Sequence, residues 1–190
     1  IRAIDPTEIP ELDVASRFIY LNRTCFNGMY RVNSKGQFNV PFGRYKNPII
    51  CDEDNLRAVS KALRDVEILN VDYKVAISKA KAGDFVYFDP PYYPISSTSS
   101  FTSYTKDGFA EKEQVELRDT FAELSNRGCY VMLSNSDSAF IRYIYGGLKN
   151  VTITTVSAGR AINSKAGGRG KITELVITNY PVGGNNGGEI

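Results

Sequence analysis

The sequence of 190 residues contains no histidine. This absence excludes catalytic triads and metal sites that depend on imidazole, so acid–base chemistry would fall to carboxylates or tyrosines. The three cysteines, Cys25, Cys51 and Cys129, show no metal-binding spacing, and no metal site is expected. Their odd number without a secretory signal suits a reducing compartment, and the cytoplasm is the expected location. No apolar run approaches the roughly 20 residues of a membrane-spanning helix, so no membrane partner is expected.

Acidic residues are missing from two long stretches, although the formal net charge of the chain is only +2. Residues 14–51 and 138–173 together contain twelve lysines and arginines and no aspartate or glutamate. The other 11 basic residues share the rest of the chain with all 21 acidic residues. This segregation favours a polyanionic partner. Two solvated faces that lack acids by chance are the alternative, but the presence of two such stretches favours nucleic acid.

Patterns typical of helices and strands alternate along the chain, which predicts an α/β fold. Apolar residues at helical spacing predict helices over residues 11–24, 52–64, 73–80, 111–127 and around 140–144. Short apolar or alternating runs predict strands over residues 66–71, 85–88, 130–133, 151–156 and 172–178. Residues 30–33 and 37–40 flank a turn signal and predict a β-hairpin. We therefore expect a helix-and-hairpin subdomain over residues 1–65, an α/β domain over 66–180 and a disordered tail over 181–190.

The tetrapeptide Asp89-Pro90-Pro91-Tyr92 directly follows the apolar run of residues 85–88. Open α/β sheets place their ligands at this end of their strands. The two prolines offer carbonyl acceptors without N–H donors and keep the backbone extended. Such a loop suits an amino group on an aromatic base, because the Asp89 carboxylate and the Pro90 carbonyl can each accept one N–H while Tyr92 stacks on the ring. A simple strand-to-loop turn with a capping Asp89 is the alternative.

The tetrapeptide resembles the catalytic motif of S-adenosylmethionine-dependent amino-methyltransferases. Residues 21–33 and 38–46 resemble the recognition segment of the Dam-type DNA adenine methyltransferases, and the resemblance continues through residues 101–104, 133–136, 169–172 and 179–180. It implies a Rossmann-like methyltransferase sheet and methylation of adenine N6 in double-stranded DNA, within GATC, after the base rotates out of the duplex. The catalytic residues would be Asp89, Pro90, Pro91 and Tyr92.

The same resemblance places Asp72, Tyr73 and Asp89 beside the methyl donor, S-adenosylmethionine. Asp72 is equally suited to cap the helix predicted over residues 73–80. The related enzymes also begin with a basic glycine-rich segment and a Phe-x-Gly-x-Gly strand end, and neither pattern occurs in these 190 residues. We therefore expect the sheet to be incomplete at its N-terminal side, with the missing segment supplied by a longer chain or by a partner polypeptide.

The predicted hairpin carries side chains of the types that read DNA bases. Arg31 can bond guanine N7 and O6, while Met29 and Pro41 can pack on a thymine methyl. Phe26 can wedge into the base stack, although a small core of Phe26, Phe38 and Phe42 is the alternative for the aromatic residues. The expected DNA contacts are completed by Asn27 and Asn39, by Arg44, Tyr45 and Lys46 on the backbone, and by Arg160, Lys165 and Arg169 in a basic loop.

Two other functions remain open at this point. The chain can be a non-catalytic DNA-binding or specificity subunit of a split methyltransferase, which the missing donor-binding segment favours. It can also belong to an amino-methyltransferase that acts on RNA or protein, since these enzymes use similar Asp/Asn-Pro-Pro-Tyr loops. The recognition segment favours DNA over both.

Overall fold

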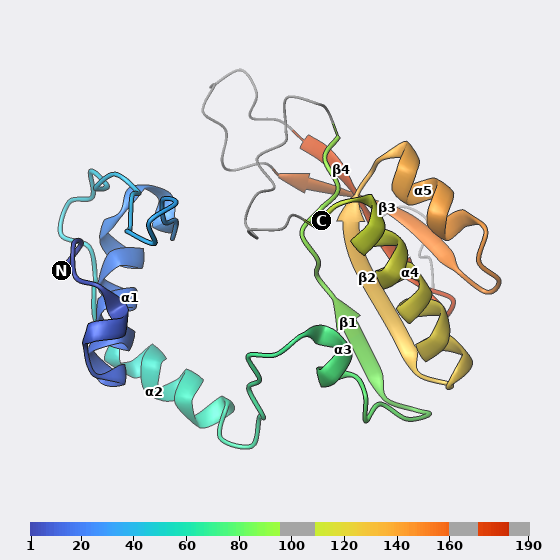
Figure 1. Cartoon of the computed structure of the whole chain (residues 1–190), viewed down its shortest axis with the longest axis horizontal. Coiled ribbons are helices and arrows are strands. Elements are labelled where there is room, and N and C mark those ends of the chain that lie inside the picture. Colours follow the sequence, from blue (N-terminus) through green and yellow to red (C-terminus); the bar gives the residue numbers. More distant parts are fainter. Residues whose placement is uncertain (96–108, 160–170, 183–190) are drawn as a thin grey trace. The chain divides into compact units, whose positions relative to one another are not determined.

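The computed structural model describes residues 1–95, 109–159 and 171–182. The chain divides into two compact units, Ile1–Ile68 and Leu69–Ile190 (Figure 1). The sequence predicts this boundary at residue 65, three residues earlier. None of the helices in the described ranges is both long and apolar enough to cross a membrane.

The helices of the first unit lie where the apolar spacing predicts them. A short 3-10 helix, η1 (Pro6–Glu8), precedes α1 (Glu11–Thr24), whose bounds match the prediction. Glu11 and Asp13 lie in the first turn of α1, where acidic side chains stabilise the helix through the positive end of its dipole. The second helix, α2 (Glu53–Ala62), is capped by Asp52, whose side chain accepts a hydrogen bond from the Asn55 N–H.

The predicted hairpin is present but short. It contains a single β-bridge, between Val32 and Phe38, flanked by backbone hydrogen bonds. The loop before it includes the 3-10 helix η2 (Phe26–Gly28), and a second bridge joins Cys25 to Phe42. The buried core beneath these loops is small and consists of Leu21, Cys25, Phe38 and Val40.

The second unit is built on one mixed sheet of four strands in the described residues. The strands are β1 (Phe85–Phe88), β2 (Tyr130–Ser136), β3 (Thr152–Gly159) and β4 (Lys171–Thr178), and their order is β1-β2-β4-β3. β1 and β2 are parallel, whereas β4 is antiparallel to both β2 and β3. The register places Phe88 opposite Leu133 and Ser136 opposite Glu174. The α/β prediction is therefore confirmed.

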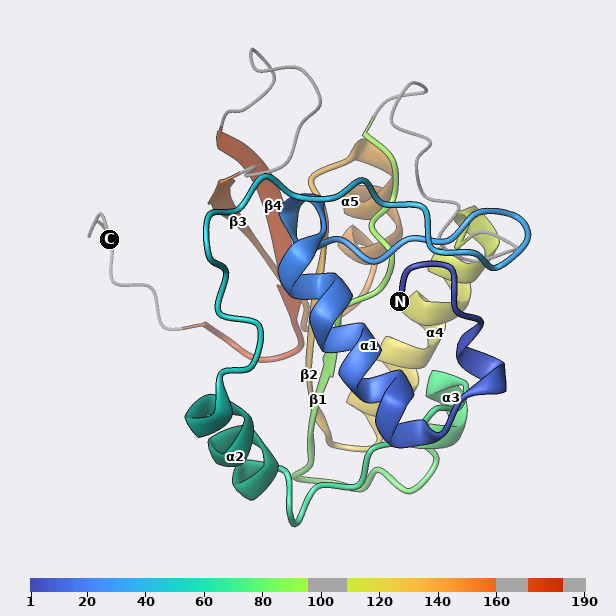
Figure 2. The ribbon, with the colours of Figure 1, turned by 90° about the vertical axis from the view of Figure 1, so that its left-hand side faces the viewer.

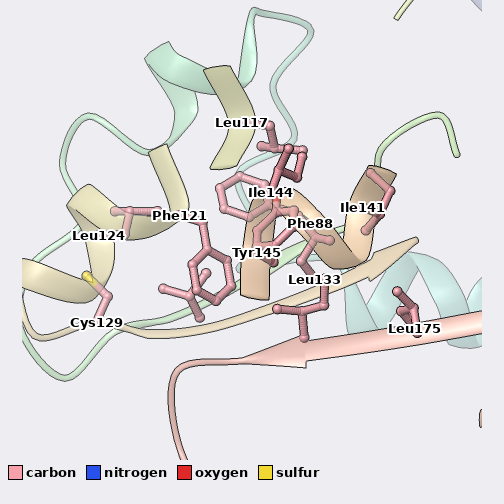
Figure 3. Packing of buried hydrophobic residues seen from close by; sticks show 12 residues of the cluster. Phe88, Leu117, Phe121, Leu124, Cys129, Leu133, Ile141, Ile144, Tyr145 and Leu175 are labelled. Carbon is pink, nitrogen blue, oxygen red and sulfur yellow. The ribbon is translucent and has the colours of Figure 1, made fainter. Parts of the chain in front are cut away.

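Two helices cover one face of this sheet (Figure 2). They are α4 (Glu111–Asn126), which is followed by Gly128 in the left-handed conformation at φ 84°, and α5 (Ala139–Gly146). The core between helices and strands contains Phe88, Leu117, Phe121, Leu124, Cys129, Val131, Leu133, Ile141, Ile144, Tyr145, Leu175 and Ile177 (Figure 3). Each large apolar side chain in it stabilises the fold by about 1.5–3 kcal/mol.

The opposite face of the sheet is open at β1 and β2. Phe85, Tyr87 and Tyr130 are 58%, 50% and 54% exposed, because successive strand residues point to alternate faces. β1 is also an edge strand, and no second strand from the described ranges pairs with it.

Several predicted elements differ from the structure. The strand predicted over residues 66–71 is wrong, since this segment has no strand partner and Ile68 is 74% exposed. Its apolar composition fits a strand, but a strand forms only where a neighbour accepts its hydrogen bonds. The helix predicted over residues 73–80 stops earlier, as α3 (Tyr73–Ala76), because Ile77 and Ala80 pack against the core as a turn. β2, in contrast, extends three residues beyond its prediction, to Ser136.

Candidate functional site

The loop Asp89–Tyr92 lies at the carboxyl end of β1, beside the carboxyl end of its parallel neighbour β2. This is the edge of the sheet at which ligands of open α/β sheets bind. β2 ends in three polar residues, Ser134, Asn135 and Ser136, which are all buried. The sheet therefore brings the predicted catalytic loop against a row of hydrogen-bonding side chains.

The Asp89 carboxylate is held by one of its two oxygens. The Ser134 hydroxyl donates to Asp89 Oδ1 at 2.8 Å, and the Tyr87 hydroxyl donates to Ser134 Oγ at 2.9 Å. Asp89 is exposed, and within the described residues Oδ2 accepts no hydrogen bond. Among those residues no backbone N–H donates to the Asp89 side chain either, so Asp89 is not the capping residue of a simple turn. One carboxylate oxygen is thus fixed, while the other has no hydrogen-bond donor within the described residues.

Tyr92 is partly buried and faces a second carboxylate. Its hydroxyl lies 3.4 Å from Glu174 Oε2, on β4. Burial raises the pKa of the Tyr92 hydroxyl above its ordinary value, and the charges of Glu174 and Asp89 act in the same direction. Tyr92 therefore stays a neutral aromatic side chain with a hydrogen to donate. Glu174 is not among the site residues predicted from the sequence, although it is the first acid after the acid-free stretch 138–173 and falls inside an apolar alternating strand.

A pair of buried amides supports the back of the loop. Gln114 of α4 and Asn135 of β2 are both fully buried, and Asn135 Nδ2 donates to Gln114 Oε1 at 3.0 Å. Gln114 Nε2 in turn donates to the Pro91 carbonyl at 2.9 Å, and the Tyr93 N–H donates to Asn135 Oδ1 at 3.0 Å. The sequence analysis assigned no role to either residue, since a glutamine inside an amphipathic helix gives no sign of being buried.

Asp72 caps the short helix α3, which is the capping alternative that its sequence position left open. Its Oδ1 accepts a hydrogen bond from the Lys74 N–H at 2.8 Å. The neighbouring Tyr73 ring packs edge-on against Phe88, with ring centroids 6.0 Å apart. Tyr73 is therefore close to the strand end that leads into Asp89, whereas contact of Asp72 and Tyr73 with a methyl donor stays a prediction.

The predicted base-reading residues gather in the first unit. A cavity of about 500 Å³ is lined by Phe26, Asn27, Pro41, Phe42, Gly43, Arg44 and Tyr45, five of which are predicted DNA contacts. Phe26 is 49% and Phe42 62% exposed, so these rings do not form the small aromatic core that was the alternative. That alternative holds only for Phe38, which is buried.

Arg31 is fixed by a side-chain contact within the hairpin. Its Nε donates to Asn39 Oδ1 at 2.8 Å, and no carboxylate of the described residues forms an ion pair with it. The guanidinium keeps its other N–H donors for a ligand. Met29, in contrast, packs partly against the small core, and Lys46 is exposed beside the cavity residues.

Several predictions fall outside this description. Arg160, Lys165 and Arg169, and residues 183–190 of the predicted tail, lie outside the described residues. Within the described ranges, no group of three or more cysteine, aspartate or glutamate side chains is arranged to hold a metal ion.

Comparison with known proteins gives a consistent set of similarities. The model of the family described as D12 class N6 adenine-specific DNA methyltransferase matches residues 1–162. The type II methyltransferase M1.LlaDCHI of Lactococcus lactis subsp. cremoris is 48% identical over 175 residues, which are 91% of this chain and 61% of that protein. The type II methyltransferase M.MjaIII of Methanocaldococcus jannaschii is 49% identical over 172 residues, or 90% and 58% of the two chains.

A DNA adenine methylase of Vibrio cholerae is 38% identical over 165 residues, which cover 86% of this chain and 58% of the relative. The chain thus spans 58% to 61% of the length of these three curated relatives. The family match over residues 1–162 contains both the hairpin and the loop at the end of β1.

Proposed function

Since the chain belongs to the D12 class of N6 adenine-specific DNA methyltransferases, we propose that it serves to transfer a methyl group from S-adenosylmethionine to adenine N6 in double-stranded DNA. The proposed target sequence is GATC, and the proposed location is the cytoplasm. The observation that carries this proposal is the presentation of Asp89 at the end of β1, where its exposed carboxylate is anchored through one oxygen and its second oxygen has no donor among the described residues.

The proposed chemistry depends on hydrogen-bond acceptors around the adenine amino group. The nitrogen lone pair is delocalised into the ring, so it becomes a nucleophile only as the nitrogen turns tetrahedral. Asp89 Oδ2 and the Pro90 carbonyl would accept the two N–H bonds and stabilise the positive charge that develops on the nitrogen. The amino group then loses one proton, for which the Asp89 carboxylate is the nearest proposed acceptor.

The methyl donor supplies a methyl group bonded to a positively charged sulfur. The residues proposed to hold it are Asp72, Tyr73 and Asp89, which offer two carboxylates and an aromatic ring close to the end of β1. This combination suits a cationic ligand that also carries sugar hydroxyls and a base. We further propose that a polypeptide segment outside these 190 residues, in the same chain or in a partner, completes the donor site.

The target adenine would have to leave the duplex to reach Asp89, at an unstacking cost of roughly a few kcal/mol. The Tyr92 ring is proposed to recover part of this cost by stacking on the extruded base. Because the pKa of Tyr92 is raised, its ring stays neutral across the working pH range and keeps its hydroxyl hydrogen directed towards Glu174.

Sequence recognition is proposed for the hairpin of the first unit. Arg31, held by Asn39, would bond guanine in the major groove, and Met29 and Pro41 would contact a thymine methyl. Phe26 and Asn27 would enter the duplex from the cavity that they line. Phosphate contacts are proposed for Arg44, Tyr45, Lys46, Arg160, Lys165 and Arg169.

The test is methyl transfer from labelled donor to GATC-containing DNA by the full-length protein and by its Asp89→Ala variant. We expect the variant to lose roughly 100-fold or more in rate, because it lacks the acceptor for the amino group. Asp65→Ala, which changes an exposed acid in the turn after α2, is the matched control and should keep the wild-type rate. Equal rates for wild type and Asp89→Ala would rule out the mechanism.

Two further measurements distinguish the proposed function from its two alternatives. A wild-type protein that binds duplex DNA but neither binds donor by titration calorimetry nor transfers methyl groups would be a non-catalytic DNA-binding subunit. Competition among duplex DNA, RNA and protein substrates tests the substrate class, and duplex DNA is expected to be methylated in preference to the other two.

A further inference from the structure

We propose that Gln114 and Asn135 form a positioning relay that fixes the backbone on both sides of Tyr92 and thereby aligns the catalytic loop. This inference rests on the proposed methyl transfer, but neither residue is proposed to touch substrate or donor. The relay runs from β2, through α4, to the loop.

The two contacts between the relay and the loop lie directly before and directly after Tyr92. Gln114 Nε2 donates to the Pro91 carbonyl at 2.9 Å, immediately before Tyr92. Asn135 Oδ1 accepts the Tyr93 N–H at 3.0 Å, immediately after Tyr92. Because Pro90 and Pro91 have no N–H of their own, the loop can be anchored there only through its carbonyls. Gln114 supplies such an anchor from a helix far along the chain.

The hydrogen-bonding direction of the relay is set by the backbone. Asn135 Oδ1 accepts from two backbone N–H groups, those of Tyr93 and Ser136, at 3.0 and 2.8 Å. Backbone N–H groups can only donate, so the amide nitrogen of Asn135 must point to Gln114 Oε1. The nitrogen of Gln114 is then left to face the Pro91 carbonyl. Neither amide can be reversed without placing two donors or two acceptors against each other.

Burial makes this arrangement stiff. Both amides are fully buried, and a buried amide that loses a partner carries the whole cost of its desolvation. The Tyr93 side chain anchors the loop further, since its ring packs on Phe140 with centroids 4.6 Å apart and its hydroxyl donates to Glu111. The part of the loop that precedes the anchors, at Asp89 and Pro90, is therefore presented on a fixed support.

The relay also affects the direction of the Pro90 carbonyl, which is proposed to accept a hydrogen bond from the adenine amino group. Neighbouring carbonyls of an extended backbone point to different sides, and both prolines keep this loop extended. Holding the Pro91 carbonyl against α4 therefore turns the Pro90 carbonyl away from α4. A relaxed Pro91 peptide would let this direction vary, which would lower the rate of the chemical step more than the affinity for DNA.

The test compares Gln114→Leu and Gln114→Met, both close to glutamine in size, with wild type in the full-length protein. Both changes remove the donor to the Pro91 carbonyl. We expect kcat with saturating donor to fall roughly 10- to 100-fold in both. The KM for GATC duplex should change by less than about threefold, because the proposed DNA contacts lie on the hairpin.

A second measurement follows the relay itself. Gln114 forms no hydrogen bond with Tyr93, yet it fixes the Asn135 amide that holds the Tyr93 N–H. Hydrogen exchange at the Tyr93 amide should therefore speed up by roughly tenfold or more in Gln114→Leu. Thr120→Val is the matched control, since Thr120 is a nearly buried polar residue of the same helix whose hydroxyl bonds only within α4. It should change neither kcat nor Tyr93 exchange by more than about twofold.

The outcomes separate the proposals. A fall in kcat with faster Tyr93 exchange supports the relay, and Gln114→Met gives the same reading if Gln114→Leu does not fold. Unchanged kcat in a folded Gln114 variant, or a loss confined to KM with Tyr93 exchange unaltered, overturns it. A wild-type protein that transfers no methyl group contradicts the proposed function instead, and Tyr93 exchange then still decides whether Gln114 holds the loop.

Discussion

At the end of β2, the Ser134 hydroxyl joins two polar side chains that come from β1 and its loop. It accepts a hydrogen from Tyr87 and donates its own to Asp89. Ser134 is only 6% exposed, so its hydroxyl lies where most water is excluded. A carboxylate held in this way loses little freedom when a ligand binds to its second oxygen.

We therefore expect Ser134→Ala to lower the rate of methyl transfer by roughly tenfold, the size of effect that one hydrogen bond to a charged group accounts for. Single-turnover rates with labelled donor measure this without a contribution from product release. Ser78→Ala, which removes an exposed hydroxyl bonded to the Val75 carbonyl in the same unit, is the control. A Ser134→Ala rate equal to wild type would show that Asp89 needs no support.

Arg31 carries a second prediction at this scale. In Arg31→Ala, preference for the guanine of GATC over other bases at that position should shrink by about 1–3 kcal/mol, because the bidentate contact to the base edge is lost. The measurement is methylation of GATC and of duplexes altered at that position. Lys35→Ala, in the exposed turn of the same hairpin, should leave the preference intact. Uniform weakening over all sequences by Arg31→Ala would contradict base reading.

The sequence alone identifies some of these residues and not others. Asp89 and Tyr92 belong to a contiguous motif, so neighbouring positions are enough to single them out. Gln114, Ser134 and Glu174 come from three different elements, and only the packing of α4 and the sheet register bring them to the loop. Nothing in the local composition around Gln114 signals its burial.

At the scale of elements, Asn179 ties the end of β4 to the start of β2 and to the end of α4. Its Oδ1 accepts the Val131 N–H at 2.7 Å, and its Nδ2 donates to the Cys129 carbonyl at 2.8 Å and the Ser125 hydroxyl at 2.6 Å. Val131 and Cys129 are both buried, which limits the access of water to these contacts.

Asn179→Ala is accordingly expected to lower the free energy of unfolding by about 2–4 kcal/mol, since it leaves a buried N–H and a buried C=O without partners. Urea unfolding of the full-length protein measures the change. Asn126→Ala provides the comparison, because Asn126 is exposed at the end of α4 and its loss should cost less than about 0.5 kcal/mol. Equal costs for the two variants would contradict a tying role for Asn179.

Helices proved easier to predict than strands. α1 and α4 carry their own signals, an apolar stripe and residues suited to the helix ends, within one contiguous segment. The composition of residues 66–71 is as typical of a strand as that of β1. Composition contains no information, however, about whether a partner strand is present. β2 extends beyond its predicted end for the converse reason. Its last three residues are polar, and their composition does not reveal that they have hydrogen-bonding partners in the fold.

At the scale of the whole molecule, each unit contributes one of the two acid-free basic stretches. Residues 14–51 belong to the first unit and residues 138–173 to the second. Each unit therefore carries basic residues suited to the proposed DNA partner. The contribution of each cation can then be measured through the counterions that DNA releases.

We expect the affinity for duplex DNA to fall steeply with salt, and the double change Arg44→Ala with Lys46→Ala to flatten the slope of log K against log salt by roughly two. Fluorescence anisotropy at several salt concentrations gives the slope. Arg57→Ala should not alter it, because Arg57 lies on α2 and pairs with Glu53 at 2.7 Å. An unchanged slope in the double variant would remove Arg44 and Lys46 from the phosphate contacts.

The unpaired outer edge of β1 sets a condition for work with this chain in the laboratory. Its backbone hydrogen-bonding groups run beside the exposed rings of Phe85 and Tyr87, and no strand of the described residues covers them. Such an edge accepts any extended peptide, including a second molecule of the same chain. Self-association through intermolecular strands is therefore expected to grow with protein concentration, which light scattering of a dilution series would measure.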